Sequence, residues 1–172
     1  MAARRTAIRV DHRGSGAAVT LYYIDASALV KRYLGEPGSA WLNDLFEAPA
    51  ANSFVSSELV AVELIAALSR ARREKRINEV RRNRLALQVA QEWRSLLESA
   101  AVTRRTITTA SELALGHPLR AYDAVHLATA ITIQSGLTAL DIQGLVFMAA
   151  DKALLLAAQA EGFLTDNPND HA

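Results

Sequence analysis

Short apolar segments rich in β-branched and aromatic residues alternate in this chain with longer segments of helical character. Residues 20–25, 52–55, 102–107 and 145–148 predict strands, and most of the chain between them carries apolar residues at helical spacing. Among the expected helices are residues 79–100 and residues 120–134, the second of which Gly136 is expected to end. Helices between strands favour parallel pairing, because each helix provides the crossover from one strand to the next. We therefore expect an α/β fold, a sandwich in which helices flank a short, mainly parallel sheet.

The length of 172 residues fits one such domain. Residues 1–19 lack hydrophobic periodicity and include the sequence RGSG, so they are interpreted as a disordered N-terminal extension. Residues 20–165 form the predicted domain, and residues 166–172 are expected to fray as a C-terminal tail.

Composition excludes several classes of protein. The chain has no cysteine, which excludes disulfide frameworks, thiolate zinc sites, iron–sulfur clusters and cysteine nucleophiles. No apolar run approaches the roughly 18 residues of a membrane span. The arginines near the N-terminus are not followed by the apolar core of a signal peptide. We expect a soluble, cytoplasmic protein.

Four acidic residues lie in apolar surroundings, where carboxylates are unusual. Asp25 ends the first predicted strand, and Asp151 directly follows the apolar segment 146–150. Glu63 lies within the apolar segment 59–68, and Asp123 lies among small apolar residues. Because an ionised group loses solvation on burial, a buried carboxylate needs a partner. Asp151 taken alone is best explained as a helix N-cap.

Four such carboxylates together are harder to explain as separate structural features. If they converge, their mutual repulsion raises their pKa values unless a cation neutralises them. Carboxylate oxygens suit hard divalent ions such as Mg²⁺ or Mn²⁺ better than zinc. In parallel α/β sheets, ligands bind beyond the carboxyl ends of the strands, which is where Asp25 and Asp151 are expected to lie.

The segments that contain these acids resemble the four blocks of PIN-domain ribonucleases, and most closely those of VapC-like toxins from bacterial toxin–antitoxin pairs. They are residues 23–31 (YIDASALVK), 62–68 (VELIAAL), 119–128 (LRAYDAVHLA) and 150–155 (ADKALL). Their order and spacing agree with the family over about residues 20–165. One departure is Ala149, where relatives often carry threonine or serine two positions before the last acid.

The resemblance implies a PIN-like three-layer α/β/α sandwich and a Mg²⁺- or Mn²⁺-dependent endoribonuclease that hydrolyses RNA phosphodiester bonds. It also implies a homodimer and a cognate VapB-like antitoxin as partners. The residues that it implies as catalytic and metal-binding are Asp25, Glu63, Asp123 and Asp151, with Ser27 as a supporting residue. Two alternatives stay open: an RNA-processing PIN nuclease without an antitoxin, and a catalytically silent PIN binding module.

Basic charge is concentrated in residues 70–84, although the whole chain has a formal net charge of only +1. This basic segment contains eight lysines and arginines against Glu74 and Glu79. Such a segment is either a solvated helix face or a surface for a polyanion. Arg72, Arg73 and Arg76 are the candidates for contact with RNA phosphates.

Histidines and tyrosines near the acids have simpler interpretations. His117 and His126 are interpreted as structural, because no cysteine or third well-placed histidine supports a zinc site. Tyr23 and Tyr122 are interpreted as core residues rather than as platforms for base stacking, because each has apolar neighbours in the sequence.

Overall fold

The structure is a computed structural model that describes residues 19–140, 142 and 144–171. The predicted N-terminal extension, residues 1–19, therefore lies outside the described residues apart from Val19. No helix in the described ranges is long and apolar enough to cross a membrane.

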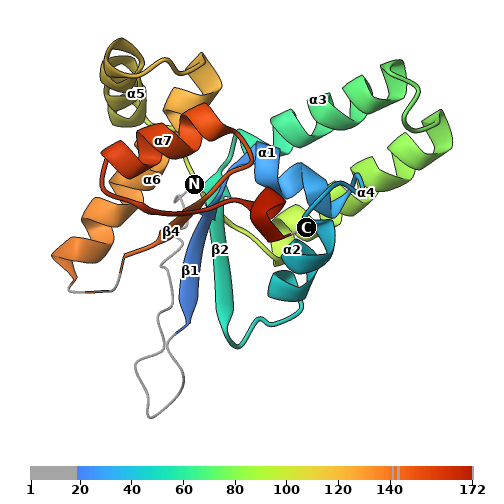
Figure 1. Cartoon of the computed structure of the whole chain (residues 1–172), viewed down its shortest axis with the longest axis horizontal. Helices are drawn as coiled ribbons and strands as arrows, with labels where there is room; N and C mark the ends of the chain where they lie inside the picture. Colours follow the sequence, from blue (N-terminus) through green and yellow to red (C-terminus); the bar gives the residue numbers. More distant parts are fainter. Residues whose placement is uncertain (1–18, 141, 143, 172) are drawn as a thin grey trace, which may run out of the picture.

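Five strands form one sheet in the order β3-β2-β1-β4-β5, and every pairing between the described strands is parallel (Figure 1). The strands are β1 (Thr20–Ile24), β2 (Asn52–Ser57), β3 (Glu98–Ala100), β4 (Val146–Met148) and β5 (Leu164–Asp166). From β1 the chain proceeds outward through β2 to β3, and it then returns to place β4 on the opposite side of β1. The strand order therefore reverses between β1 and β4, which is where open α/β sheets bind ligands.

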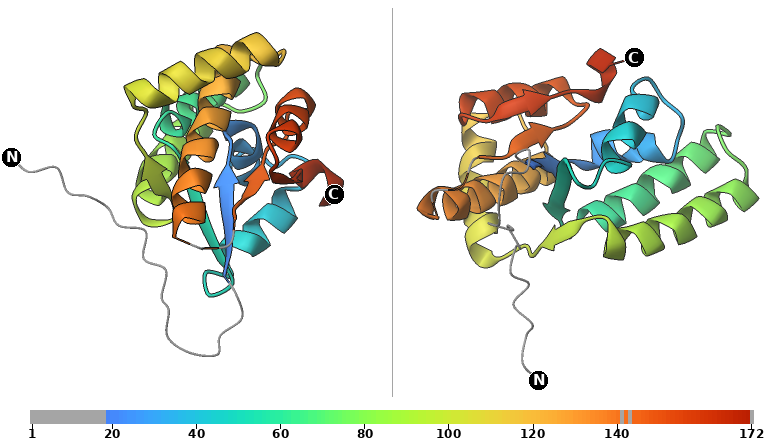
Figure 2. Two further views of the ribbon diagram at one scale, coloured as in Figure 1. Left: turned by 90° about the vertical axis from the view of Figure 1, so that its left-hand side faces the viewer. Right: turned by 90° about the horizontal axis from the view of Figure 1, so that it is seen from below.

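Helices cover both faces of this sheet, which gives the predicted three layers (Figure 2). They are α1 (Ala26–Leu29), the 3₁₀ helix η1 (Val30–Arg32), α2 (Ser39–Phe46), α3 (Val60–Arg73), α4 (Glu79–Ser95), α5 (Arg104–Gly116), α6 (Ala121–Ala139), α7 (Lys152–Ala160) and the 3₁₀ helix η2 (Pro168–His171). Alternate strand residues enter opposite cores: Tyr23 and Phe147 pack with α5, α6 and α7, whereas Ile24 and Met148 pack with α1 to α4. Because successive residues of a strand face opposite cores and both cores are apolar, the strands appear in the sequence as continuous apolar runs.

Three element boundaries differ from the sequence-based expectation. Residues 102–107 do not form a strand, because Thr103 caps α5 and forms a capping box with Thr106. The preceding helix ends at Ser95 rather than at residue 100, and residues 98–100 become the edge strand β3. Helix α6 continues through Gly136, which was expected to end it, to Ala139.

The prediction that residues 166–172 fray is wrong for residues 166–171. Asp166 of β5 pairs with Met148 of β4, and Pro168 is buried. The imidazole of His171 stacks on the Trp41 ring with 3.8 Å between ring centroids. Gly38 has a φ of 82°, and a Cβ there would lie 1.9 Å from the Pro168 carbonyl oxygen. The tail therefore docks closely against the start of α2.

A hydrogen-bonded cluster around Glu92 joins α4 to the segment after α1. The Glu92 carboxylate accepts hydrogen bonds from Arg32 Nε at 2.8 Å, the Tyr33 hydroxyl at 2.9 Å and Gln88 Nε2 at 2.9 Å. Burial by itself raises the pKa of Glu92, but these hydrogen bonds and the Arg32 charge outweigh burial and lower it below its ordinary value.

We expect Glu92→Gln to reduce the free energy of unfolding near neutral pH. A lowered pKa in the folded state stabilises the fold above the ordinary carboxyl value of 4.5, and this stabilisation is lost as the pH falls through the folded pKa. The difference from wild type should therefore narrow on acidification. Urea unfolding across this range measures it, and a difference independent of pH would contradict the ionic explanation.

Candidate active site

All four carboxylates singled out in the sequence lie at the N-terminal ends of helices. Asp25 follows β1 and caps α1, where its Oδ2 accepts from the Ser27 backbone N–H at 2.8 Å. Asp151 caps α7, where its Oδ1 accepts from the Leu154 N–H at 3.0 Å. Glu63 and Asp123 lie in the first turns of α3 and α6. The unpaired N–H groups and the dipole of a helix N-terminus favour a negative charge there.

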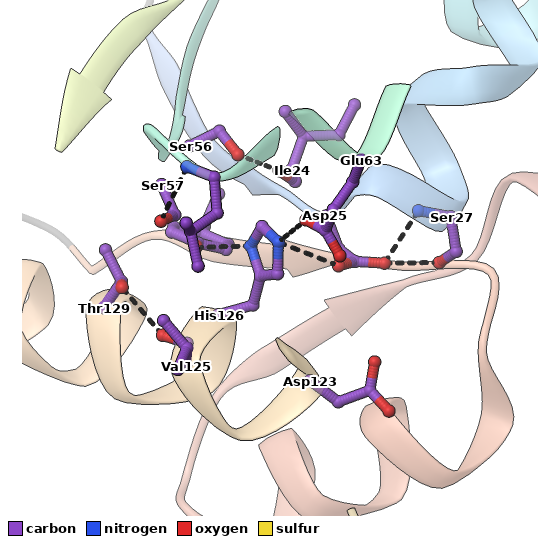
Figure 3. Close-up of polar contacts among 12 residues, drawn as sticks. Ile24, Asp25, Ser27, Ser56, Ser57, Glu63, Asp123, Val125, His126 and Thr129 are labelled. Carbon is purple, nitrogen blue, oxygen red and sulfur yellow. Dashed lines mark hydrogen bonds and ion pairs between the residues drawn. The ribbon is translucent and has the colours of Figure 1, made fainter. Parts of the chain in front are cut away.

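Ser27 connects the ends of β1 and β4, the two strands between which the strand order reverses. Its hydroxyl donates to Asp25 Oδ2 at 2.5 Å (Figure 3). It also accepts a hydrogen bond from the Ala150 N–H at 2.9 Å. The first contact fixes a carboxylate that is 4% exposed, and the second contact reaches the residue before Asp151. Ser27 thereby ties the segment after β1 to the segment after β4.

Glu63 reaches the site from α3 and meets a buried imidazole. Its Oε2 lies 2.5 Å from His126 Nε2, and the same nitrogen is 3.6 Å from Asp25 Oδ1 (Figure 3). His126 Nδ1 lies 2.8 Å from the Tyr23 hydroxyl. The sequence interpretation of His126 as a structural residue did not include this direct contact with Glu63. The sequence did contain a signal that His126 lies near the acids. It follows Asp123 by three residues, so the two side chains lie on the same side of α6.

Asp123 lies within the electrostatic reach of two of the other carboxylates. Burial raises its pKa, and repulsion from Asp25 and then Asp151 raises it further. The hydrogen bond from the Arg120 N–H, at 3.2 Å, opposes these effects without cancelling them. A carboxylate in this position is stabilised by any cation that joins the site.

The buried imidazole experiences the same negative charge. Burial lowers the pKa of His126, but the hydrogen bond to Glu63 and the charges of Asp25, Glu63 and Asp123 outweigh burial and raise it. His126 contacts both Glu63 and Asp25, and Asp123 is close enough to Asp25 and Asp151 for their charges to raise its pKa. We call Asp25, Glu63, Asp123 and Asp151 together the acidic centre. Its charge is strongly negative, because the donors are carboxylates with a single histidine beneath them.

The donors at this centre suit a hard divalent cation, since they are carboxylate oxygens. In the described residues, no three His, Asp or Glu side chains converge closely enough to hold a metal ion as they lie. One oxygen each of Glu63, Asp123 and Asp151 is held by His126, the Arg120 N–H and the Leu154 N–H, respectively. Their second oxygens can serve as ligands, so the residue types fit the metal.

His117, Tyr23 and Tyr122 are interpreted from the sequence as structural or core residues. His117 pairs with Glu161 at 2.9 Å on the surface, in agreement with a structural role. Tyr23 is fully buried, as expected for a core residue. Tyr122 is 60% exposed, so the interpretation of Tyr122 as a core residue is wrong.

The basic segment forms the far end of the α3–α4 hairpin, which projects from the body of the domain (Figure 1). Glu63 and Arg73 are separated by roughly 15 Å along α3 at the helical rise per residue. Arg72 Nη2 pairs with Glu79 at 3.2 Å, and Arg76 Nη2 pairs with Glu36 at 2.6 Å. Arg73 is exposed at the end of α3. These arginines therefore lie outside the acidic centre.

Comparisons with known proteins agree with this architecture. Residues 22–153 match the family model of the PIN domain. Two proteins of Mycobacterium tuberculosis, Ribonuclease VapC45 and Ribonuclease VapC49, are each 33% identical over 145 residues, which is 83% of this chain and 92% of the relative. A chain in the crystal structure of VapBC2 from Rickettsia felis, bound to a DNA fragment from their promoter, shares the fold with a TM-score of 0.57 at 14% identity. That alignment covers 86% of this chain and 98% of the other. The three-layer sandwich, the match to the family model and the identity to these relatives show that this chain belongs to the PIN-domain family.

Proposed function

We propose that this protein is an endoribonuclease that depends on Mg²⁺ or Mn²⁺ and acts as the toxin of a toxin–antitoxin pair. Its catalytic and metal-binding residues are Asp25, Glu63, Asp123 and Asp151. The observation that carries this proposal is the position of these carboxylates at helix N-termini, where burial and the charges of Asp25 and Asp151 raise the pKa of Asp123. The names of the two relatives, both called ribonucleases, support the choice of RNA as substrate.

Each residue of the centre contributes a distinct role to this reaction. A divalent cation at these carboxylates supplies polarisation of the scissile phosphate and a more acidic bound water. Ser27 holds Asp25 in one orientation, which reduces the reorganisation needed on binding. Asp123 is one of the two carboxylates that can assist removal of a proton from the attacking water. Glu63 is the other carboxylate that can accept one.

The expected protein partners are a second copy of this chain and a VapB-like antitoxin, and the expected location is the cytoplasm. The solved VapBC2 structure supports an antitoxin as partner, because its chain shares this fold. On α3, next to Glu63, Val62 is 69% exposed and Ile65 is 39% exposed, which provides apolar surface for a partner. The α2 residues Leu42 and Phe46 are buried in the core and provide none. Light scattering at tens of micromolar tests the homodimer, and a strict monomer would refute it.

Incubation of the purified protein with total cellular RNA and Mn²⁺ tests the central proposal. A nuclease produces discrete fragments, whereas a silent PIN binding module retains RNA and leaves it intact. Co-purification with the product of an adjacent small gene, followed by loss of cleavage in the complex, separates a toxin from an RNA-processing nuclease without an antitoxin. Intact RNA under all metal conditions would refute the enzymatic function.

We expect the triple variant Arg72→Gln, Arg73→Gln and Arg76→Gln to bind RNA more weakly than the protein with its arginines intact. Each phosphate contact contributes about −0.7 to the slope of log affinity against log salt for a single strand, so the slope should become shallower by up to roughly two units. The ion pairs of Arg72 and Arg76 reduce this effect, because they must open for RNA to bind. Binding is measured in the Asp25→Asn background to prevent cleavage. An unchanged slope would identify the basic segment as a solvated face.

A further inference from the structure

His126 lies beneath the acidic centre with no exposed surface, and the proposed chemistry does not use it. Its Nε2 lies between two carboxylates, 2.5 Å from Glu63 Oε2 and 3.6 Å from Asp25 Oδ1. Figure 3 shows the ring between Glu63, which comes from α3, and Asp25, which comes from the junction of β1 and α1. One side chain of α6 therefore contacts acids from two other elements.

The hydrogen bonds assign a role to each ring nitrogen. A carboxylate only accepts hydrogen bonds, so the short contact with Glu63 requires a proton on Nε2. On the other side of the ring, the Tyr23 hydroxyl lies 2.8 Å from Nδ1. When this hydroxyl donates to Nδ1, the neutral ring is held in the tautomer whose Nε2–H points at Glu63.

Tyr23 is well suited to hold the ring in this orientation. It is completely buried and stacks on Phe147 with 5.2 Å between ring centroids. A phenol is un-ionised near neutral pH, so the hydroxyl keeps its proton and can donate it to Nδ1. Tyr23, His126 and Glu63 thus form a continuous chain from the core of the domain to the acidic centre.

We propose that His126, oriented by Tyr23, is the positioning residue that holds Glu63 beside Asp25 for metal binding. This inference rests on the proposed function, since it assumes that both carboxylates bind the cation. Two like charges from different helices repel each other, and a long glutamate side chain has many rotamers. A buried N–H donor between them offsets the repulsion and restricts Glu63 to one conformation before the metal arrives. Removal of a group that orients a metal ligand in this way typically weakens metal binding by about 10- to 100-fold.

Calorimetric titration of the full chain with Mn²⁺ tests this role in three variants. His126→Leu removes the donor and should weaken Mn²⁺ binding by about 10- to 100-fold. His126→Gln restores an N–H donor and should recover most of the affinity. Tyr23→Phe keeps the stacked ring but releases Nδ1, and should weaken binding several-fold. At saturating Mn²⁺, His126→Leu should lower kcat for RNA and leave KM unchanged.

His117→Gln is the matched control, because it breaks the exposed His117–Glu161 pair outside the site and should leave Mn²⁺ affinity unchanged. Wild-type affinity in a folded His126→Leu protein would overturn the proposal. If His126→Leu does not fold, the test depends on Tyr23→Phe. Wild-type Mn²⁺ affinity in Tyr23→Phe would then overturn the proposal.

Asp25→Asn in the same titration distinguishes this inference from the proposed function. Loss of Mn²⁺ binding in Asp25→Asn but not in His126→Leu refutes only the role of His126. Unchanged binding in Asp25→Asn refutes the metal site, and the role of His126 with it.

Discussion

Replacement of Asp25 or Asp123 by asparagine is expected to lower the rate of RNA cleavage at least about a hundredfold, because each change removes a ligand charge and disturbs the positioning of water. Asparagine has nearly the same shape and still presents an oxygen to the helix N-terminus. The Ser27 N–H to residue 25 and the Arg120 N–H to residue 123 therefore keep an acceptor. The measurement is single-turnover cleavage of a defined RNA with each variant.

The same variants should fold normally, and in metal-free buffer they should melt at or above the temperature of the wild type. Removal of one charge from a crowded site relieves repulsion; the pKa of Asp123 is raised by burial and, in addition, by the charges of Asp25 and Asp151. Asp44→Asn on the exposed face of α2 is the control for the loss of one negative charge and should cleave at the wild-type rate. Melting temperatures well below wild type for both site variants would point to structural roles for Asp25 and Asp123.

Removal of divalent metal is expected to abolish cleavage, and addition of Mg²⁺ or Mn²⁺ is expected to restore it. Without a cation the acidic centre repels RNA phosphates, and its carboxylates alone do not stabilise the charge of the transition state. The assay compares wild-type protein in excess EDTA with the same sample after Mn²⁺ is supplied in excess. Cleavage that continues undiminished in EDTA would falsify the metal mechanism.

Thermal melting provides a measurement of the metal that does not depend on catalysis. A ligand that binds only the folded protein raises the melting temperature with its concentration. Mn²⁺ should therefore raise the melting temperature of the wild type, and should raise that of Asp25→Asn much less. An equal rise in both proteins would place the bound metal elsewhere.

The class of fold and the identity of the acidic residues could be predicted from local sequence. Buried strands of a parallel sheet read as apolar runs, so β1 and β4 were recognised without knowledge of their partners. The acid that follows each of these strands was predicted to lie at the carboxyl edge, and the structure places both there. Asp25, Glu63, Asp123 and Asp151 were conspicuous because a carboxylate among apolar residues is costly unless it has partners.

Elements that depend on distant contacts could not be predicted in the same way. Residues 98–100 have no apolar pattern, and they become the edge strand β3 only because β2 offers its unpaired edge. Gly136 does not end α6, because packing of the helix outweighs the weak local preference of one glycine. Residues 166–171 look polar and terminal, yet His171 packs on Trp41, which lies far away in sequence.

The sequence alone determined which side chains are candidates for the chemistry, because each acid is unusual among the apolar residues of its own segment. Only the tertiary structure decided what each acid contacts, since the partners come from separate elements. Ser27 reaches Ala150 across the point where the strand order reverses, and His126 of α6 reaches Glu63 of α3. Hydrogen bonds form over about 3 Å and depend on direction, so they follow from the packing of helices on the sheet and not from spacing along the chain.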